Sequence, residues 1–119
     1  MQHLQPPKAK RVVITGVGVV SPIGIGKSAF WAGLSRGASG VRPVTLFDTT
    51  HTRSKQAAYI PDFKPEDMLG VPGMKNLDRT TKLALCASKL ALEDANFTIN
   101  EENAAETGVA LGSTNGSVY

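Results

Sequence analysis

The stretch RVVITGVGVVSPIGIG, from Arg11 to Gly26, decides how this chain is interpreted. Its apolar residues do not alternate with polar ones, a pattern typical of a strand that is covered on both faces rather than one that faces water. Ser21 and Pro22 then interrupt the apolar run, as turn residues do. The stretch therefore predicts a buried strand over residues 11–20, followed by a glycine-rich turn.

Glycines at fixed offsets after a strand are also typical of nucleotide-binding sites, where backbone N–H groups bind phosphate. A P-loop ending in Gly26-Lys27-Ser28 needs a glycine where this chain has Ser21, and Pro22 removes a backbone donor. A dinucleotide fingerprint that begins at Gly16 also meets Ser21 at its third glycine, and the short-chain reductase variant meets Val20. A nucleotide-binding α/β domain therefore stays only as an alternative.

The same residues resemble the opening of the β-ketoacyl synthases, the thiolase-fold condensing enzymes of fatty-acid and polyketide assembly. Elongating members of the synthase II type begin with R-V-V-[IV]-T-G-x-G-x-[VL]-[ST]-P-x-G, which this chain reproduces from Arg11 to Gly24. Further segments resemble the family in the same order: Phe30-Trp31, Ser39-Gly40-Val41, Phe47-Asp48-Thr49, Asp62-Phe63, Leu77-Asp78-Arg79, Ala91-Leu92-Glu93-Asp94-Ala95 and the strand at 108–113. The resemblance covers about residues 8 to 119.

The resemblance implies an α/β, layered thiolase-like fold, of which this chain is an incomplete N-terminal part with the order β-α-β-α-β. The residue patterns place its elements in that order, with right-handed crossovers and therefore parallel strands, at 11–20 (strand), 27–36 (helix), 54–60 (strand), 77–95 (helix) and 108–113 (strand). The segment 61–73 holds three prolines and two glycines and is expected to be an irregular surface excursion. Residues 1–10 are expected to form a flexible tail, and residues 11–119 a partial N-terminal synthase domain.

The helix expected over residues 77–95 has an apolar packing face that includes the chain's one cysteine, Cys86. Asn76 is the expected N-cap, and Asn96 suits a left-handed exit. Lys89 and Glu93, four residues apart, are expected to pair and contribute about 0.2–0.5 kcal/mol. A cysteine in mid-helix without a nearby base is far more often a small core residue than a nucleophile.

The resemblance implies that the parent protein is an enzyme, which condenses an acyl thioester with malonyl-carrier protein and releases carbon dioxide. The family's nucleophilic cysteine and its two histidines lie further along the chain, and neither His3 nor His51 matches them. The 119 residues alone are therefore predicted to carry no catalytic residue and no condensing activity, because the reaction needs a thiolate and enolate-stabilising donors. No metal site and no cofactor are expected, since clustered Cys and His ligands are lacking.

Two low-weight binding roles follow from the resemblance. Thr114 and Asn115 lie where the family borders its acyl tunnel, although Asn-Gly is also a strong turn signal. Lys75 and Arg79 match the region where related synthases place cations that dock the acidic acyl carrier protein, although a solvated helix start explains them equally well. The complete protein is expected to form a homodimer; a noncatalytic partner module resembling a chain-length factor is the second alternative.

Composition agrees with a cytoplasmic globular segment. The chain is 41% hydrophobic and 19% charged, with a formal net charge of +3. No apolar run reaches the roughly 18 residues that a membrane span needs, and no secretory leader is visible. Because the basic residues are not clustered among aromatic ones, neither nucleic acid nor membrane is an expected partner.

Overall fold

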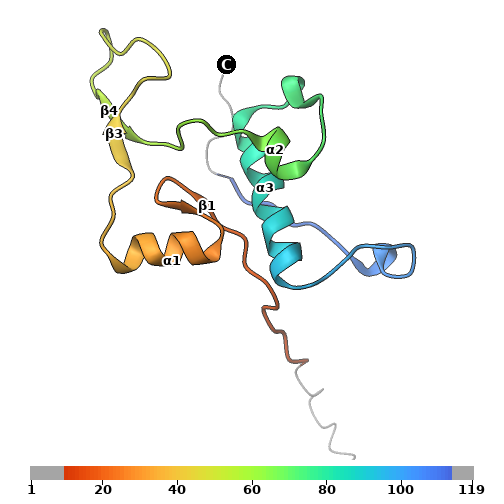
Figure 1. Ribbon diagram of the computed structural model, residues 1–119. Coiled ribbons are helices and arrows are strands. Elements are labelled where there is room, and N and C mark those ends of the chain that lie inside the picture. The colour runs from red at the N-terminus through yellow and green to blue at the C-terminus, as the bar shows by residue number, and fades with distance from the viewer. Residues whose placement is uncertain (1–9, 114–119) are drawn as a thin grey trace, which may run out of the picture.

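The fold is organised around one long helix, α3 (Arg79–Asp94), against which segments from the start and the end of the chain are laid (Figure 1). The computed structural model describes residues 10–113. The other elements, in chain order, are β1 (Val20–Ser21), β2 (Gly24–Ile25), α1 (Lys27–Ser35), β3 (Val41–Pro43), β4 (Gln56–Ala58), α2 (Pro65–Leu69), η1 (Met74–Asn76) and η2 (Ala104–Glu106). The two predicted helices are therefore present, at nearly the predicted bounds.

The ends of α3 follow from local chemistry. The N-cap is Asp78, whose carboxylate accepts a hydrogen bond from the backbone N–H of Thr81 at 2.8 Å. The prediction of Asn76 was wrong, because Asn76 ends the short helix η1 and the extended Leu77 separates the two helices. At the other end, Asn96 adopts a φ of 49°, which confirms the left-handed exit.

One face of α3 touches the signature segment directly, backbone to backbone. A Cβ atom added at Gly16 would lie 2.3 Å from the carbonyl oxygen of Ala91, and one added at Gly18 would lie 1.9 Å from that of Ala87. Both distances are far below van der Waals contact, so only glycine fits at these two positions. The small residues of α3 and the glycines of the signature together form a glycine–alanine joint, defined here by Gly16, Gly18, Ala87 and Ala91.

The signature segment itself is not the long strand that the apolar pattern predicts. Only its end pairs, as β1 with β2 in an antiparallel hairpin that joins Val20 to Ile25 and Ser21 to Gly24. Val12 and Ile14 are 93% and 88% exposed, and in the described part of the chain no strand pairs with residues 11–19. An apolar run indicates burial in a sheet, but it does not supply the neighbouring strands whose backbone groups complete that sheet.

The third predicted strand, at 108–113, likewise has no regular structure and no strand partner within residues 10–113. Val109 is 82% exposed. The segment still lies beside α3 and the signature segment, because Thr107 to Leu111 line one groove together with Gly16 and Ala91. The two segments predicted as strands are thus brought to the same helix without being hydrogen-bonded to each other.

The middle of the chain differs from the predicted parallel arrangement. β4 lies inside the predicted strand 54–60, but it pairs antiparallel with β3, placing Arg42 opposite Ala57. A hairpin results because the two strands follow each other along the chain with only a loop between them, so no crossover is needed. The excursion 61–73, expected to be irregular, contains α2, since Pro65 stands at the first turn, where its missing N–H costs nothing, and Gly70 ends the helix at a φ of 68°.

Candidate functional site

The two predicted docking cations lie close to the start of α3 but in different environments. Lys75 is exposed in η1, next to Met74, which is only 6% exposed. The guanidinium of Arg79 donates through Nη2 to the carbonyl oxygen of Ile60 at 2.8 Å and lies 5.3 Å from the centre of the Phe63 ring. Arg79 thereby ties the 60–63 loop to α3, whereas the Lys75 amine faces solvent.

The predicted acyl-pocket residues, Thr114 and Asn115, lie outside the described residues. The chain immediately before them lines a groove of about 450 Å³ along the first half of α3. Thr81, Leu85, Val109, Leu111 and Ser113 are among its lining residues. The segment that leads to Thr114 therefore runs along an apolar wall with hydroxyl groups at its rim.

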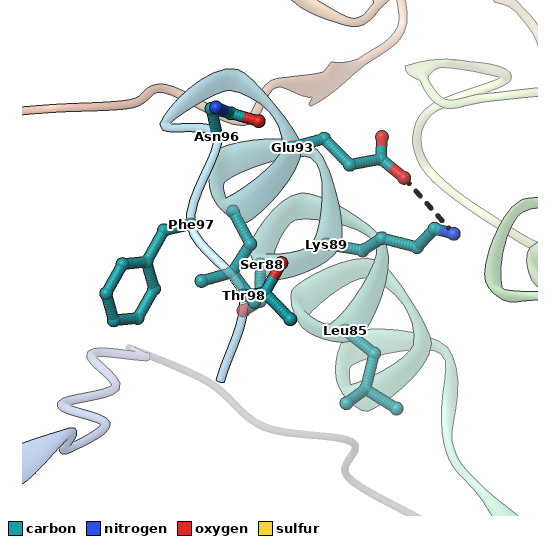
Figure 2. Close-up of a pocket in the computed structure, with 8 residues that line it drawn as sticks. Leu85, Ser88, Lys89, Glu93, Asn96, Phe97 and Thr98 are labelled. Carbon is teal, nitrogen blue, oxygen red and sulfur yellow. Dashed lines mark ion pairs between the residues drawn. The ribbon is translucent and has the colours of Figure 1, made fainter. Parts of the chain in front are cut away.

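A second groove, of about 540 Å³, lies on the C-terminal half of α3 (Figure 2). Leu85 and Phe97 stand along it, and the ion pair between Lys89 Nζ and Glu93 Oε1, 3.2 Å long, lies at its edge. This pair confirms the predicted spacing. Because both charges of the groove are paired with each other and no nucleophile lines it, the groove has the character of a packing surface rather than a catalytic pocket.

Cys86 is completely buried in the middle of α3. Burial raises the pKa of its thiol, and the negative charge of Glu66 raises it further. Both effects disfavour the thiolate, which is the reactive form. The interpretation of Cys86 as a core residue agrees with this environment.

We expect Cys86 to be unreactive toward a thiol reagent such as 5,5′-dithiobis(2-nitrobenzoate) in the folded chain at pH 8. Addition of denaturant should make the single thiol react at the rate of a free cysteine, because unfolding exposes the sulfur and removes the influence of Glu66. Stopped-flow absorbance would measure both rates. Rapid labelling of the native chain would contradict the buried, protonated thiol.

Lys27, the lysine of the rejected phosphate-binding triplet, is used in an intramolecular contact. Its amine forms an ion pair with Asp94 at the end of α3, and the same carboxylate accepts a hydrogen bond from the backbone N–H of Val17 at 3.0 Å. The Lys27 hydrogen bond, followed by that from Val17, lowers the pKa of Asp94. Asp94 thus joins α1, the signature segment and α3, and this use of Lys27 agrees with the failed glycine spacing.

Two of these connecting residues, Asp94 and Arg42, had no signal in the sequence. Arg42 donates to the carbonyl oxygens of Pro22 at 3.2 Å and Gly40 at 3.3 Å, and its guanidinium lies 5.8 Å from the Tyr59 ring centre. Their partners are distant in sequence, 77 residues away for the Asp94 bond to Val17 and 20 for the Arg42 bond to Pro22. Local patterns do not reveal such pairs.

Over residues 10–113, no group of three or more His, Cys, Asp or Glu side chains is arranged to hold a metal ion. His51 is exposed in the loop between β3 and β4. Within the same range, none of the helices combines the length and the apolar character needed to cross a membrane.

Comparison with known proteins identifies the family. A family model described as "Beta-ketoacyl synthase, N-terminal domain" matches residues 9–119. The chain is 42% identical over 104 residues to 3-oxoacyl-[acyl-carrier-protein] synthase 2 of Coxiella burnetii, and 40% identical over 103 residues to the protein of the same name from Synechocystis sp.. These alignments cover 87% of this chain and 25% of each relative, so the chain spans about a quarter of the length of the curated relatives it matches.

A solved structure, "The ishigamide ketosynthase/chain length factor", superimposes with a TM-score of 0.66 at 38% sequence identity. The superposition covers 72% of this chain and 21% of that one. The predicted fold class, a partial thiolase-like α/β fold, is confirmed by this likeness and by the family match. The chain therefore belongs to the β-ketoacyl synthase family and matches its N-terminal domain.

Proposed function

We propose that these residues are the N-terminal portion of a β-ketoacyl-acyl-carrier-protein synthase. That enzyme joins an acyl thioester to malonyl-carrier protein, with loss of carbon dioxide, in fatty-acid or polyketide biosynthesis. The observation that carries the proposal is the 42% identity to a 3-oxoacyl-[acyl-carrier-protein] synthase 2 over 87% of the chain. The glycine–alanine joint supports it, because the two glycines of the family signature contact α3 directly and no phosphate cradle is needed to explain them.

In this proposal the chain serves as scaffold. Condensation requires an attacking thiolate and hydrogen-bond donors that stabilise the enolate and the oxyanion. Cys86 is buried with a raised thiol pKa, and His51 stands in an exposed loop on a different part of the molecule. The catalytic cysteine and histidines of the complete enzyme are therefore assigned to residues outside this sequence, and the chain alone is expected to be inactive.

The acyl carrier protein, the homodimer and the cytoplasmic location belong to the same proposal. Lys75 is an exposed cation that an acidic carrier protein could contact, and Arg79 holds the neighbouring 60–63 loop in place through Ile60 and Phe63. Thr114 and Asn115 are proposed to border the acyl chain, as their position after the groove-lining Ser113 suggests.

A chimera tests the enzymatic assignment. The segment of the Coxiella burnetii relative that aligns with this chain would be replaced by the corresponding residues of this chain, and elongation of an acyl-primed carrier protein by malonyl-carrier protein would be followed by mass spectrometry. We expect the chimera to retain condensing activity within about tenfold of the parent enzyme. A folded chimera with no activity would contradict the assignment, and product formation by the 119-residue chain alone would contradict its scaffold role.

A noncatalytic partner of the chain-length-factor type is the second candidate, because the solved relative with a TM-score of 0.66 carries that name together with a ketosynthase. Co-expression with a complete ketosynthase distinguishes the two. A stable heteromeric complex in which only the other subunit is acylated would favour the partner module over the enzyme.

A further inference from the structure

The charges of this chain are divided between two parts of the molecule. Residues 27–59, which contain α1, β3 and β4 and are called the basic region here, hold five Lys or Arg residues and a single acidic residue, Asp48. Residues 60–113, with α2 and α3, hold five Lys or Arg residues and nine Asp or Glu residues. With His51 neutral, the two parts carry formal charges of +4 and −4, although the whole chain is only mildly basic.

The division is spatial as well as sequential. α1 and the β3–β4 hairpin lie on one side of the molecule, and α2 and α3 lie on the other (Figure 1). Lys27 is paired with Asp94, which belongs to the acidic part, and so links the two. Arg36 and Arg53 are exposed, and neither has an ion-pair partner among the described residues. These two cations remain available to a partner.

The basic region also exposes large apolar side chains. Trp31 and Leu34 of α1 are 67% and 52% exposed, and Leu46 and Phe47 in the hairpin loop are 54% and 61% exposed. Exposed aromatic and aliphatic groups beside unpaired cations are typical of protein-binding surfaces.

The hairpin loop is held in one shape by its own hydrogen bonds. Asp48 accepts from the backbone N–H and the hydroxyl of Thr50, at 2.9 and 2.6 Å. Lys55 donates to the carbonyl oxygens of Thr49 and Thr50 across the loop. Because the loop is already braced internally, little conformational freedom is left to lose when a partner contacts Phe47.

From the charge division and the exposed apolar groups, we propose that the basic region is a docking surface for an acidic protein, namely the acyl carrier protein; this rests on the proposed synthase function. The carrier protein is acidic, so the +4 region attracts it over a distance while the −4 region around Lys75 and Arg79 opposes its approach. Arg36 and Arg53 provide the attraction, and Trp31 and Phe47 provide apolar contact area. Lys75 then makes at most a secondary contact.

Nucleic acid is the weaker occupant of this surface. Tight binding to a phosphate backbone uses about 6–10 cationic contacts. In the basic region Lys27, Arg42 and Lys55 are engaged with Asp94 or with backbone carbonyl groups, which leaves Arg36 and Arg53. Two free cations beside aliphatic side chains fit a protein surface better than a polyanionic strand.

The test measures association of the full 119-residue chain with holo acyl carrier protein of Coxiella burnetii by surface plasmon resonance at 50 and 300 mM NaCl. The variant Arg36→Glu/Arg53→Glu should associate at least about tenfold more slowly at low salt, and the difference should shrink at high salt. The matched variant Lys75→Glu/Lys82→Glu changes the net charge equally and should have a smaller effect. Trp31→Ser/Phe47→Ser should speed dissociation without changing the salt dependence.

Three results would overturn the proposal: no binding by the unmodified chain, an equal or larger loss in the Lys75→Glu/Lys82→Glu variant, or tighter binding of a 20-nucleotide single strand that competes with the carrier protein. Circular dichroism of every variant guards against loss of folding. Because the activity of the chimera does not depend on this measurement, failure of the docking surface and failure of the synthase assignment give different results.

Discussion

Replacement of Gly18 by alanine is expected to destabilise the chain by about 1–3 kcal/mol, the usual range for an atom forced into a closed contact. The added Cβ would lie 1.9 Å from the carbonyl oxygen of Ala87 and 2.6 Å from the backbone nitrogen of Ala91. All the atoms that it meets there are backbone atoms of α3, which cannot rotate away as a side chain does. The signature segment must therefore separate from the helix.

Urea denaturation followed by far-ultraviolet circular dichroism, which reports α3, would measure the change. Gly108→Ala is the matched control, because nothing lies within 4 Å of the added methyl group and its φ is not in the left-handed region, so its stability should stay within about 0.5 kcal/mol of the unmodified chain. Equal stability of the two variants would show that the glycine–alanine joint is not formed.

The second large effect is expected at Asp94, where substitution by asparagine should lower the stability at neutral pH and remove part of its pH dependence. Hydrogen bonds from Lys27 and from the Val17 backbone hold the pKa of the Asp94 carboxyl below its usual value. A carboxyl with a depressed folded-state pKa stabilises the fold above its unfolded pKa of about 3.9, and this contribution is lost as the pH falls through the lower, folded value. Asp94→Asn should therefore flatten the stability curve below about pH 4.

Thermal melts of Asp94→Asn, Lys27→Met and the double variant, taken between pH 2 and pH 7, would test this. If Asp94 and Lys27 act together, the double variant should be less destabilised than the sum of the single ones. Asp48, whose pKa is lowered chiefly by the Thr50 hydroxyl, leaves a residual slope in the same range. Additive effects would mean that the contact with Lys27 contributes nothing; an unchanged acid-side slope in Asp94→Asn would contradict the role of the carboxylate.

The sequence predicts what is encoded within a few turns of chain. The helix α3, its left-handed exit at Asn96 and the pair of Lys89 with Glu93 were predictable, because each depends on spacings of a few residues. The cap was misassigned to Asn76 because two acceptable capping residues lie close together, and only the intervening extended Leu77 selects Asp78.

Contacts between distant segments were not predictable in the same way. The apolar run at 11–20 indicates a buried strand, but strand pairing depends on a neighbour, and within the described residues only Val20 and Ser21 find one. The connections made by Asp94 and Arg79 depend on partners 77 and 19 residues away. Family resemblance supplied the fold class, whereas the residues that join its parts came from the structure.

The joint between the signature segment and α3 imposes an unusual requirement on the sequence. Most contacts select for a chemical group, but at Gly16 and Gly18 the backbone of the helix occupies the space where any side chain would begin. What is required at these positions is the absence of atoms. A saturation scan there should rank substitutions by volume alone, with serine and alanine alike and with polarity making no difference, so the identity of this family is written partly in what its first strand leaves out.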